Sequence, residues 1–338
     1  MSFAAQKGVF GIIGAGNFTN MIILPSLKGS GAKVKTIASS GGTSGTQLAK
    51  KYDISQTTTD YKKILNDNDI DTVIITTRHN THSKLVIESL KKRKNTFVEK
   101  PLALNQEELE QIIKTFNRMQ LNTKNQNHEN NTPTLTVGFN RRFSPHLIKV
   151  KQSIKGSVGP VNIIANMNAG FIPTNHWVHD LEQGGGRILG EACHLIDVCV
   201  YLSSSLVKSV CMNTLGTETI EETDNASIML KFQNGSNAVI NYFSNGSKKY
   251  SKERVEIYSQ ERTWIVDNYR KTEAFGVKGF KTLKTKLDKG HQNQFNEFVR
   301  RVKESGKPLI SIKEIINVTK ASLAAINSMK TNQWVDVD

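Results

Sequence analysis

The sequence predicts an α/β protein with two domains: a doubly wound parallel sheet, followed by an α+β domain with a large, mostly antiparallel open sheet. Its 338 residues suit about two domains of ordinary size. Short apolar runs alternate with helical patterns over the first 140 residues or so, as expected of a parallel sheet with helices on both faces. From Gly159 to Asp267 short strand patterns predominate instead. We therefore expect domains at residues 1–140 and 141–338.

Five strands are expected in the first domain, each a short apolar run: Val9–Ile13, Val34–Ala38, Asp71–Thr77, Asn95–Pro101 and Thr134–Asn140. Helical patterns lie between them, at Met21–Leu27, Gln47–Tyr52, His82–Lys94 and from Leu104 onward. Asn105 is the expected N-cap of the last helix, with Glu108 three residues later as in a capping box. The polar, asparagine-rich segment Asn122–Pro133 is expected to be an exposed loop.

The second domain is expected to contain strands at Val161–Asn168, Ala226–Phe232, Asn237–Phe243 and Arg254–Ser259. A hairpin turn is predicted at Gln233-Asn234-Gly235-Ser236. The pattern also predicts a helix over Glu191–Leu202 and two closing helices, from about His291 and about Ser311.

The composition limits the class of protein. No apolar run is long enough for a membrane span, and the first residues lack the pattern of a secretory signal. Three cysteines give no disulfide framework and favour a reducing, cytoplasmic location. The net charge of +15 raises nucleic acid as a partner, but the lysines are scattered and no recognition motif is present. A basic surface also favours a nucleotide cofactor or an anionic small substrate.

A glycine turn follows the first strand. Gly14-Ala15-Gly16 stands between a strand and a helix, where glycines allow a pyrophosphate to approach the helix N-terminus. Thr19 replaces the third glycine of the dinucleotide fingerprint, and an ordinary tight turn is the alternative reading. The second strand ends in Ser39-Ser40 rather than in an acid or an arginine, so both NAD and NADP stay open.

Several segments together resemble a known family. In chain order they read GIIGAGNF, TTRHNTH, VEKPLAL, GFNRRFSP and GGGRILGEACHLIDVCVYL. They are similar to the glucose–fructose oxidoreductase and inositol dehydrogenase family (Gfo/Idh/MocA) of NAD(P)-dependent sugar oxidoreductases. The resemblance covers nearly the whole chain. It implies a Rossmann domain, a substrate-binding domain whose open sheet often mediates oligomerisation, and action on a secondary hydroxyl of a sugar, cyclitol or sugar nucleotide.

The resemblance also implies roles for individual residues. Lys100 is expected beside the nicotinamide as an acid/base or electrostatic group, with Glu99 orienting it and Pro101 fixing the turn. His194 is expected to be the general acid/base. Many relatives carry aspartate four residues before this histidine, where this chain has Gly190. Glu191 follows and is expected to substitute in part for that aspartate.

The remaining expectations concern binding. Residues expected to contact the cofactor are Gly14, Gly16, Asn17, Phe18, Ser39, Ser40, Thr77, Arg78, Asn80, His82, Glu99, Lys100 and Pro101. The substrate is expected to be a carbohydrate, and the basic residues favour one that carries an anionic group. The residues expected to contact it are Lys100, Asn140, Arg141, Arg142, His176, Trp177, Arg187 and His194. Alternative roles are turn and helix capping for the loop after the third strand, and structural ion pairs for Arg141 and Arg142.

Three rival functions stay open at this point. His176-x-x-His179 and Glu191-x-x-His194 have the spacing of metal ligands, although we expect no metal. A dinucleotide-binding regulator or a nucleic-acid binder would be a protein of another class. Some relatives use NAD transiently in a redox-neutral reaction, such as glycosidic bond cleavage. A homodimer or tetramer is expected, because an open sheet leaves one face to be covered.

Overall fold

The chain divides into two units, and neither is one continuous segment. The computed structural model describes residues 8–124, 133–154, 159–216, 223–304 and 307–337. The first unit comprises Met1–Gly138 and His291–Ile315, and the second comprises Phe139–Gly290 and Ile316–Asp338. The sequence-based boundary near residue 140 does not anticipate this return of the chain to the first unit.

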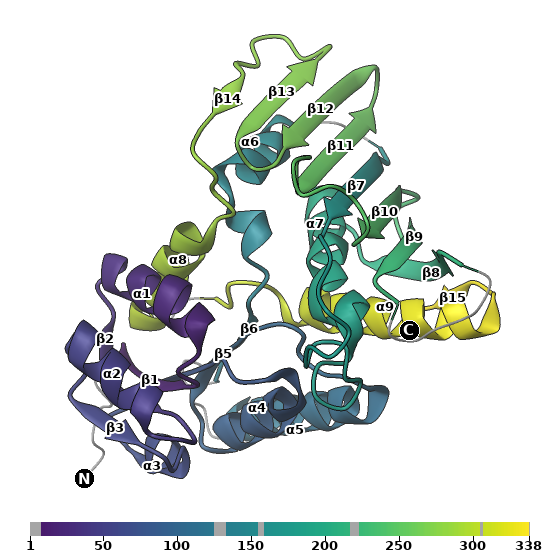
Figure 1. Ribbon diagram of the computed structural model, residues 1–338. Coiled ribbons are helices and arrows are strands. Elements are labelled where there is room, and N and C mark those ends of the chain that lie inside the picture. The colour runs from purple at the N-terminus through teal and green to yellow at the C-terminus, as the bar shows by residue number, and fades with distance from the viewer. Residues whose placement is uncertain (1–7, 125–132, 155–158, 217–222, 305–306, 338) are drawn as a thin grey trace. The chain divides into compact units, whose positions relative to one another are not determined.

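The first unit contains a parallel sheet of six strands in the order β3-β2-β1-β4-β5-β6 (Figure 1). All five predicted strands are present: β1 (Val9–Ile13), β2 (Lys33–Ala38), β4 (Thr72–Ile75), β5 (Asn95–Val98) and β6 (Leu135–Val137). The sequence analysis missed β3 (Gln56–Thr58), which is short, polar and at the edge of the sheet. Strands β1 and β4 are buried throughout, as parallel strands covered on both faces should be.

Helices cover this sheet, and in Figure 1 α4 lies beside α5 and α1 beside α8. Their bounds are η1 (a π-helix, Thr19–Ile23), α1 (Leu24–Gly29), α2 (Thr43–Tyr52), α3 (Lys62–Asn66), η2 (a 3₁₀ turn, His79–Thr81), α4 (His82–Lys91), α5 (Gln106–Lys124) and α8 (His291–Glu304).

The predicted N-cap of α5 is confirmed, and the Glu108 carboxylate binds the residue just before this cap. The backbone N–H of Glu108 donates to Asn105 Oδ1 at 2.9 Å, and that of Leu104 donates to Glu108 Oε2 at 2.8 Å. The helix continues to Lys124, so the prediction of a loop was wrong for Asn122–Lys124. Most of the rest of that predicted loop, 125–132, lies outside the described residues.

Helix α8 completes the core of the first unit. The rings of Phe295 and Phe298 lie 5.0 and 5.3 Å from that of Phe97 on β5, and Phe298 also contacts Phe10 on β1. Periodicity identified this helix, but it carries no information about which of two cores the helix joins.

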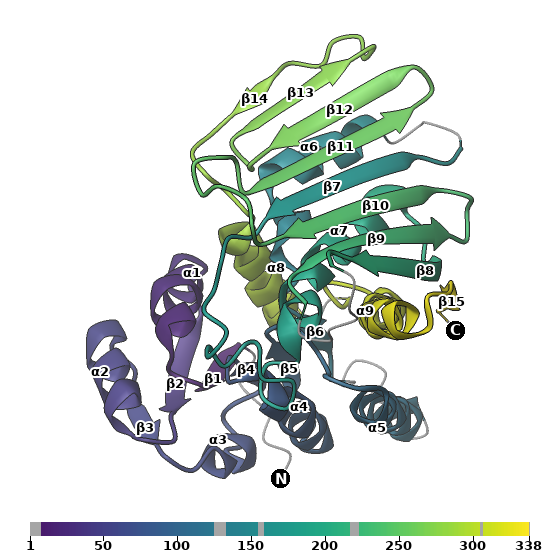
Figure 2. The same ribbon diagram turned by 45° about the vertical axis from the view of Figure 1, so that its right-hand side comes forward.

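The second unit is built on a sheet of nine strands, in the order β14-β13-β12-β11-β7-β10-β9-β8-β15 (Figure 2). Their bounds are β7 (Asn162–Asn168), β8 (Val207–Thr214), β9 (Asn225–Phe232), β10 (Asn237–Phe243), β11 (Glu253–Ser259), β12 (Arg262–Asp267), β13 (Lys271–Phe275), β14 (Leu283–Lys284) and β15 (Val335–Asp336). Only the β7–β10 pair is parallel among these described strands, so the expected mostly antiparallel sheet is confirmed.

Helices α6 and α7 lie on one face of this sheet (Figure 2). The elements are η4 (a 3₁₀ turn, Asn140–Phe143), α6 (Pro145–Ile154), η5 (a π-helix, Ile188–Ala192), α7 (Cys193–Ser203) and α9 (Ile312–Thr331), of which the part from Ile316 belongs to this unit. In β7 the residues of one face, Ile163, Ala165 and Met167, are buried, whereas those of the other face are half-buried or exposed. We call this second side the open face of the sheet.

Candidate active site

The carboxyl edge of the parallel sheet gathers three of the predicted segments. Strand order reverses between β1 and β4, and ligands of such sheets bind outside the carboxyl ends of the strands at this point. The glycine turn follows β1, Thr76 and Thr77 follow β4, and Glu99-Lys100-Pro101 follows β5. These segments therefore share one edge of the sheet.

The glycine turn has the geometry that a dinucleotide requires. Gly14 has φ = +116°, and a Cβ on it would lie 2.7 Å from the carbonyl carbon of Thr76. A Cβ on Gly16 would meet no heavy atom of the described residues within 4 Å. The helix begins there, because Asn20 N–H donates to Gly16 O at 3.1 Å. Open space at a helix N-terminus, beside backbone without side chains, fits a pyrophosphate group.

Thr19 takes part in holding this turn, a role that the sequence analysis missed. Its Oγ1 donates to Gly14 O at 3.1 Å, and Thr76 Oγ1 donates to the same carbonyl at 3.1 Å. The two hydroxyls are themselves 2.7 Å apart. The residue that replaces the third glycine thus ties the turn to the end of β4. The only signal in the sequence was a hydroxyl residue at that position.

The residues expected near the cofactor ribose are two serines, Ser39 and Ser40. Ser39 Oγ accepts a hydrogen bond from Gly45 N–H at 3.1 Å and so braces the start of α2. Ser40 is exposed. Of the other predicted contacts, Asn17 and Phe18 open the helix after the turn, and Phe18 packs edge-on against the His291 ring at 6.0 Å.

The loop after β4 contains residues of two kinds. Arg78 and Asn80 are exposed at the carboxyl edge, and Thr77 Oγ1 accepts a hydrogen bond from Thr81 at 2.6 Å. His82, by contrast, is fully buried at the start of α4. Its two ring nitrogens contact the carbonyl oxygens of Pro101 and Thr77.

The Glu99-Lys100-Pro101 turn leaves the sheet beside β6. Glu99 N–H donates to Ile75 O at 2.9 Å, which places the residue directly after the ladder. The Glu99 carboxylate lies against Gly138, where an added Cβ would be 2.6 Å from Oε1. Lys100 is partly exposed, and its bond to Pro101 is cis. A charged pair of residues therefore ends a strand that is buried up to Val98.

The second unit carries the other half of the expected residues. His194 lies in the first turn of α7, 5% exposed, with its ring edge-on to Phe139 at 6.3 Å. A π-helical turn, η5, comes directly before it and contains Gly190 and Glu191. Such turns are frequent at functional sites. Asp197, on the next turn, is paired with Arg142.

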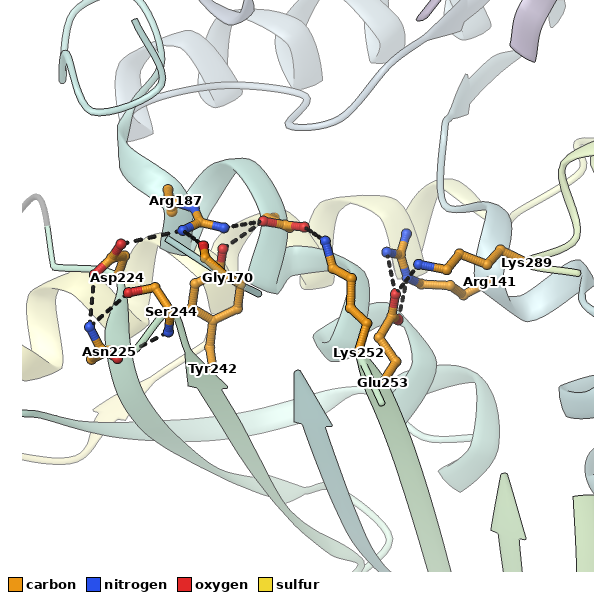
Figure 3. A network of polar contacts seen from close by, with 11 residues as sticks. Arg141, Gly170, Arg187, Asp224, Asn225, Tyr242, Ser244, Lys252, Glu253 and Lys289 are labelled. Atoms are coloured by element: carbon orange, nitrogen blue, oxygen red, sulfur yellow. Dashed lines mark hydrogen bonds and ion pairs between the residues drawn. The ribbon is translucent and has the colours of Figure 1, made fainter. Parts of the chain in front are cut away.

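Glu191 is the centre of a polar network, and its partners Arg187, Tyr242 and Lys252 are labelled in Figure 3. Its Oε2 accepts from Arg187 Nη2 at 3.0 Å and from the Tyr242 hydroxyl at 2.6 Å, and its Oε1 accepts from Lys252 Nζ at 3.0 Å. The buried Arg187 also binds Gly170 O at 2.8 Å and Asp224 at 3.3 Å. Both carboxylate oxygens of Glu191 are therefore engaged by hydrogen-bond donors of neighbouring side chains.

Arg141 and Arg142 are each paired with a buried carboxylate. Arg141 donates to both oxygens of Glu253 at 2.9 and 3.0 Å, and Lys289 also contacts this carboxylate (Figure 3). Burial opposes ionisation of Glu253, but these two cations lower its pKa to about 2. Arg142 donates to both oxygens of Asp197 at 3.0 and 2.5 Å. The arginines expected at the substrate are therefore neutralised inside the unit.

The remaining predicted substrate residues are Asn140, His176 and Trp177. Asn140 Nδ2 donates to Lys289 O at 2.8 Å, next to the Arg141 pair. His176 is exposed in the segment between β7 and η5, with its ring 5.8 Å from that of Trp177. Across the described residues, no three His, Cys, Asp or Glu side chains gather as a metal site would need.

Comparison with known families decides the kinship of the chain. Residues 9–124 match the model described as "Oxidoreductase family, NAD-binding Rossmann fold", and residues 148–265 match the Gfo/Idh/MocA C-terminal domain. Together the two matches span more than half of the chain, in the order that the family requires. The chain belongs to the Gfo/Idh/MocA family.

Relatives in the Gfo/Idh/MocA family are distant in sequence. The uncharacterized oxidoreductase YrbE of Bacillus subtilis is 27% identical over 78% of this chain and 75% of its own length. The myo-inositol 2-dehydrogenase of Thermotoga maritima is 24% identical over 78% of this chain and 79% of its own. The fold is also that of a solved levoglucosan dehydrogenase in complex with NADH and levoglucosan, with a TM-score of 0.82 at 20% identity, covering 97% of this chain and 99% of the other.

Membership in the Gfo/Idh/MocA family makes the protein an NAD(P)-dependent oxidoreductase with an NAD-binding Rossmann domain. Gly14 and Lys100 fall inside the part matched by the N-terminal model, and His194 inside the part matched by the C-terminal one. Within the described residues, no helix has the length and apolar character of a membrane span.

Proposed function

We propose that the protein is a dehydrogenase that moves a hydride between the nicotinamide of NAD or NADP and a secondary hydroxyl of a sugar, cyclitol or sugar nucleotide. One observation carries this proposal: the Lys100 turn and the glycine turn stand at the same carboxyl edge, on either side of the strand reversal. Family membership and the names of relatives that act on inositol and levoglucosan support it.

The proposed chemistry assigns the oxygen and its proton to two residues. Bound nicotinamide would accept the hydride from carbon. The alcohol must then lose its proton, and a cation near the oxygen stabilises the developing negative charge. We assign that stabilisation to Lys100, with the Glu99 carboxylate orienting it. His194 takes the proton on a nitrogen of its imidazole ring.

Glu191 is proposed to act as a fixed charge rather than as the proton relay. It precedes His194 by three residues, and Arg187, Tyr242 and Lys252 hold its carboxylate in place. Its negative charge would favour the imidazolium form of His194 after the proton is taken up. Asn140, His176 and Trp177 stay in the proposal as substrate contacts.

We still propose that the substrate carries an anionic group, but we assign its binding to a different residue. Because Arg141 and Arg142 are paired with Glu253 and Asp197, they are proposed to position the substrate side of the unit rather than to bind the anion. Lys252, whose side chain is 41% exposed, is the cation of the Glu191 network that a substrate can reach.

The first test is fluorescence titration with NADH and NADPH, with denaturation of a sample to release any retained dinucleotide. Turnover is then screened with inositols, levoglucosan, uronic acids and sugar nucleotides. Binding of either dinucleotide and oxidation of one substrate class is the expected result. Failure of both dinucleotides to bind would overturn the proposal. A cofactor that stays bound while products show no net redox change would favour the redox-neutral alternative.

The second test replaces the two proposed catalytic residues. Lys100→Ala and His194→Asn are expected to fold, to keep their cofactor affinity and to lose on the order of a hundredfold or more in kcat, since they act on the proton and the oxygen charge. Initial rates and NADH titrations of both variants check this. A rate close to that of wild type in either variant would remove that residue from the mechanism.

A further inference from the structure

His82 lies directly beneath the Lys100 turn, and the proposed chemistry does not use it. It is 0% exposed at the first position of α4. Its Nδ1 is 2.8 Å from Pro101 O, and its Nε2 is 3.2 Å from Thr77 O. Both neighbours are carbonyl oxygens, which only accept hydrogen bonds.

A neutral imidazole can satisfy one of these carbonyls by donation. Burial, together with the positive charge of Lys100, lowers the pKa of His82 to about 4, although the two carbonyls oppose this shift. The ring is therefore neutral near pH 7 and carries one N–H. The shorter contact assigns that hydrogen to Nδ1, so that His82 donates to Pro101. A second histidine, His79, has its ring 5.6 Å from that of His82.

The bond to Pro101 lies in the middle of a turn that is fixed at both ends. Glu99 N–H donates to Ile75 O at one end, and Leu104 N–H donates to Glu108 Oε2 at the other. Pro101 has no backbone N–H, and it is buried. A buried carbonyl that loses its donor is costly, so the turn depends on His82 for its geometry.

We propose that His82 is a positioning residue, which fixes the Glu99-Lys100-Pro101 turn through its Pro101 bond and thereby directs the Lys100 ammonium. The inference rests on the proposed role of Lys100. It also gives α4 a second role. Besides covering the parallel sheet, this helix would hold the turn that directs Lys100 at the carboxyl edge.

Three substitutions of His82 distinguish the contribution of its hydrogen bond to Pro101 from that of its burial and from that of its contact with Thr77. In His82→Asn the amide nitrogen replaces Nδ1 and can still donate to Pro101. In His82→Gln the amide nitrogen replaces Nε2 and can donate only toward Thr77. His82→Phe keeps a ring and has no donor. His146→Phe is the matched control, because His146 is a fully buried histidine of the second unit that binds Thr272 and Thr285.

The first readout is steady-state turnover beside NADH affinity. We expect His82→Asn to keep kcat within about threefold of wild type. His82→Gln and His82→Phe should lose about tenfold or more in kcat, with the dissociation constant of NADH changed by less than about twofold, because a small misplacement of a reacting group is costly. Equal losses in the Asn and Gln variants, or losses matched by His146→Phe, would overturn the proposal.

The second readout needs no enzymatic activity. The rate of acetylation of Lys100 is measured as a function of pH by peptide mass spectrometry. Lys84, an exposed lysine on α4, is the internal standard. The Gln and Phe variants should change the Lys100 rate by about threefold or more while the Asn variant does not. An unchanged Lys100 rate in all three would overturn the positioning role. A changed rate in a protein that oxidises no sugar would uphold the role and refute the proposed function instead.

Discussion

Thr19 shows how a departure from a motif is compensated by one hydroxyl. The dinucleotide fingerprint has glycine at this place, for close packing of helix on strand. Here the side chain turns back and, with Thr76, donates to the Gly14 carbonyl. The turn keeps its shape through hydrogen bonds where a full fingerprint would keep it through close packing.

Removing that hydroxyl should weaken cofactor binding. Thr19→Val keeps the shape of the residue and loses its hydrogen bonds to Gly14 and Thr76. A lost hydrogen bond is worth about 1 kcal/mol, so the dissociation constants of NADH and NADPH should rise by about fivefold to tenfold. Titration by NADH fluorescence measures this. Thr331→Val, which removes a hydroxyl from α9 in the second unit, should leave the affinity unchanged. An unaffected Thr19→Val would show that the turn does not need this bond.

At the scale of single residues, the sequence was sufficient to predict features that depend on neighbouring residues along the chain. The glycine turn, Glu99-Lys100 and the Asn105 cap are local patterns. The glycine turn follows β1 and Asn105 caps α5 as predicted, whereas Glu99-Lys100 comes directly after β5 and not within the strand. The partners of Arg141 and Glu191 were not predictable in the same way. Glu253 is 112 residues from Arg141, and Tyr242 is 51 residues from Glu191. Nothing in either local segment specifies such a pairing.

Among the elements, β11 joins three parts of the second unit through its first residue. Glu253 is fully buried and binds Arg141 of η4 and Lys289. The other face of the same strand carries Glu256, which is paired with Arg254 at 2.6 Å and partly exposed. One strand thus presents a fully buried ion pair and a partly exposed one on opposite faces.

Glu253→Gln should destabilise the second unit by about 3 kcal/mol at pH 7, because the Arg141 charge stays buried without its carboxylate. The folded pKa of about 2 lies below the ordinary 4.5, so the wild-type advantage is complete above pH 4.5 and is lost as the pH falls toward 2. All three tryptophans, Trp177, Trp264 and Trp334, belong to this unit. Urea unfolding followed by tryptophan fluorescence at pH 7, 5 and 3 therefore measures the effect.

Glu256→Gln is the matched control on the same strand. A partly exposed pair is worth about 0–1 kcal/mol, so this variant should lose much less stability than Glu253→Gln at pH 7. Equal destabilisation by the two substitutions, or a Glu253 effect that does not shrink at pH 3, would contradict the assignment of the buried pair.

Elements with strong periodicity were predicted well, and weak ones were not. Strand β3 has the polar sequence Gln56-Thr57-Thr58, and α3 covers one turn and a half, so neither gave a pattern to detect. The placement of α8 failed for another reason. Its apolar face was evident, but the contacts of Phe295 and Phe298 lie about 200 residues away along the chain.

At the scale of the whole molecule, the open face of the nine-stranded sheet carries an apolar row. The register places Cys211 beside Met229, Met229 beside Val239, and Val239 beside Ile164, across four neighbouring strands. Met229 is 42% exposed. We propose that a second copy of the chain covers this row, since contiguous exposed apolar patches mark association sites.

A charge in the middle of the row should break the association. Val239→Lys is expected to halve the mass in solution, from a dimer to a monomer or from a tetramer to a dimer, because the buried ammonium would lack a partner. Light scattering after size-exclusion chromatography measures the mass. Thr46→Lys adds the same charge to the exposed surface of α2 and should change nothing. A wild-type monomer, or an unchanged mass in Val239→Lys, would contradict this surface.

The late position of α8 in the chain has a consequence for biosynthesis. The ribosome finishes β6 about 150 residues before it begins the helix that covers Phe10 and Phe97. At about 5–20 residues per second, this part of the nascent sheet waits roughly 8 to 30 seconds for its cover. During that interval the uncovered sheet is a target for chaperones and proteases. A chain truncated between residues 138 and 291 would never gain this cover.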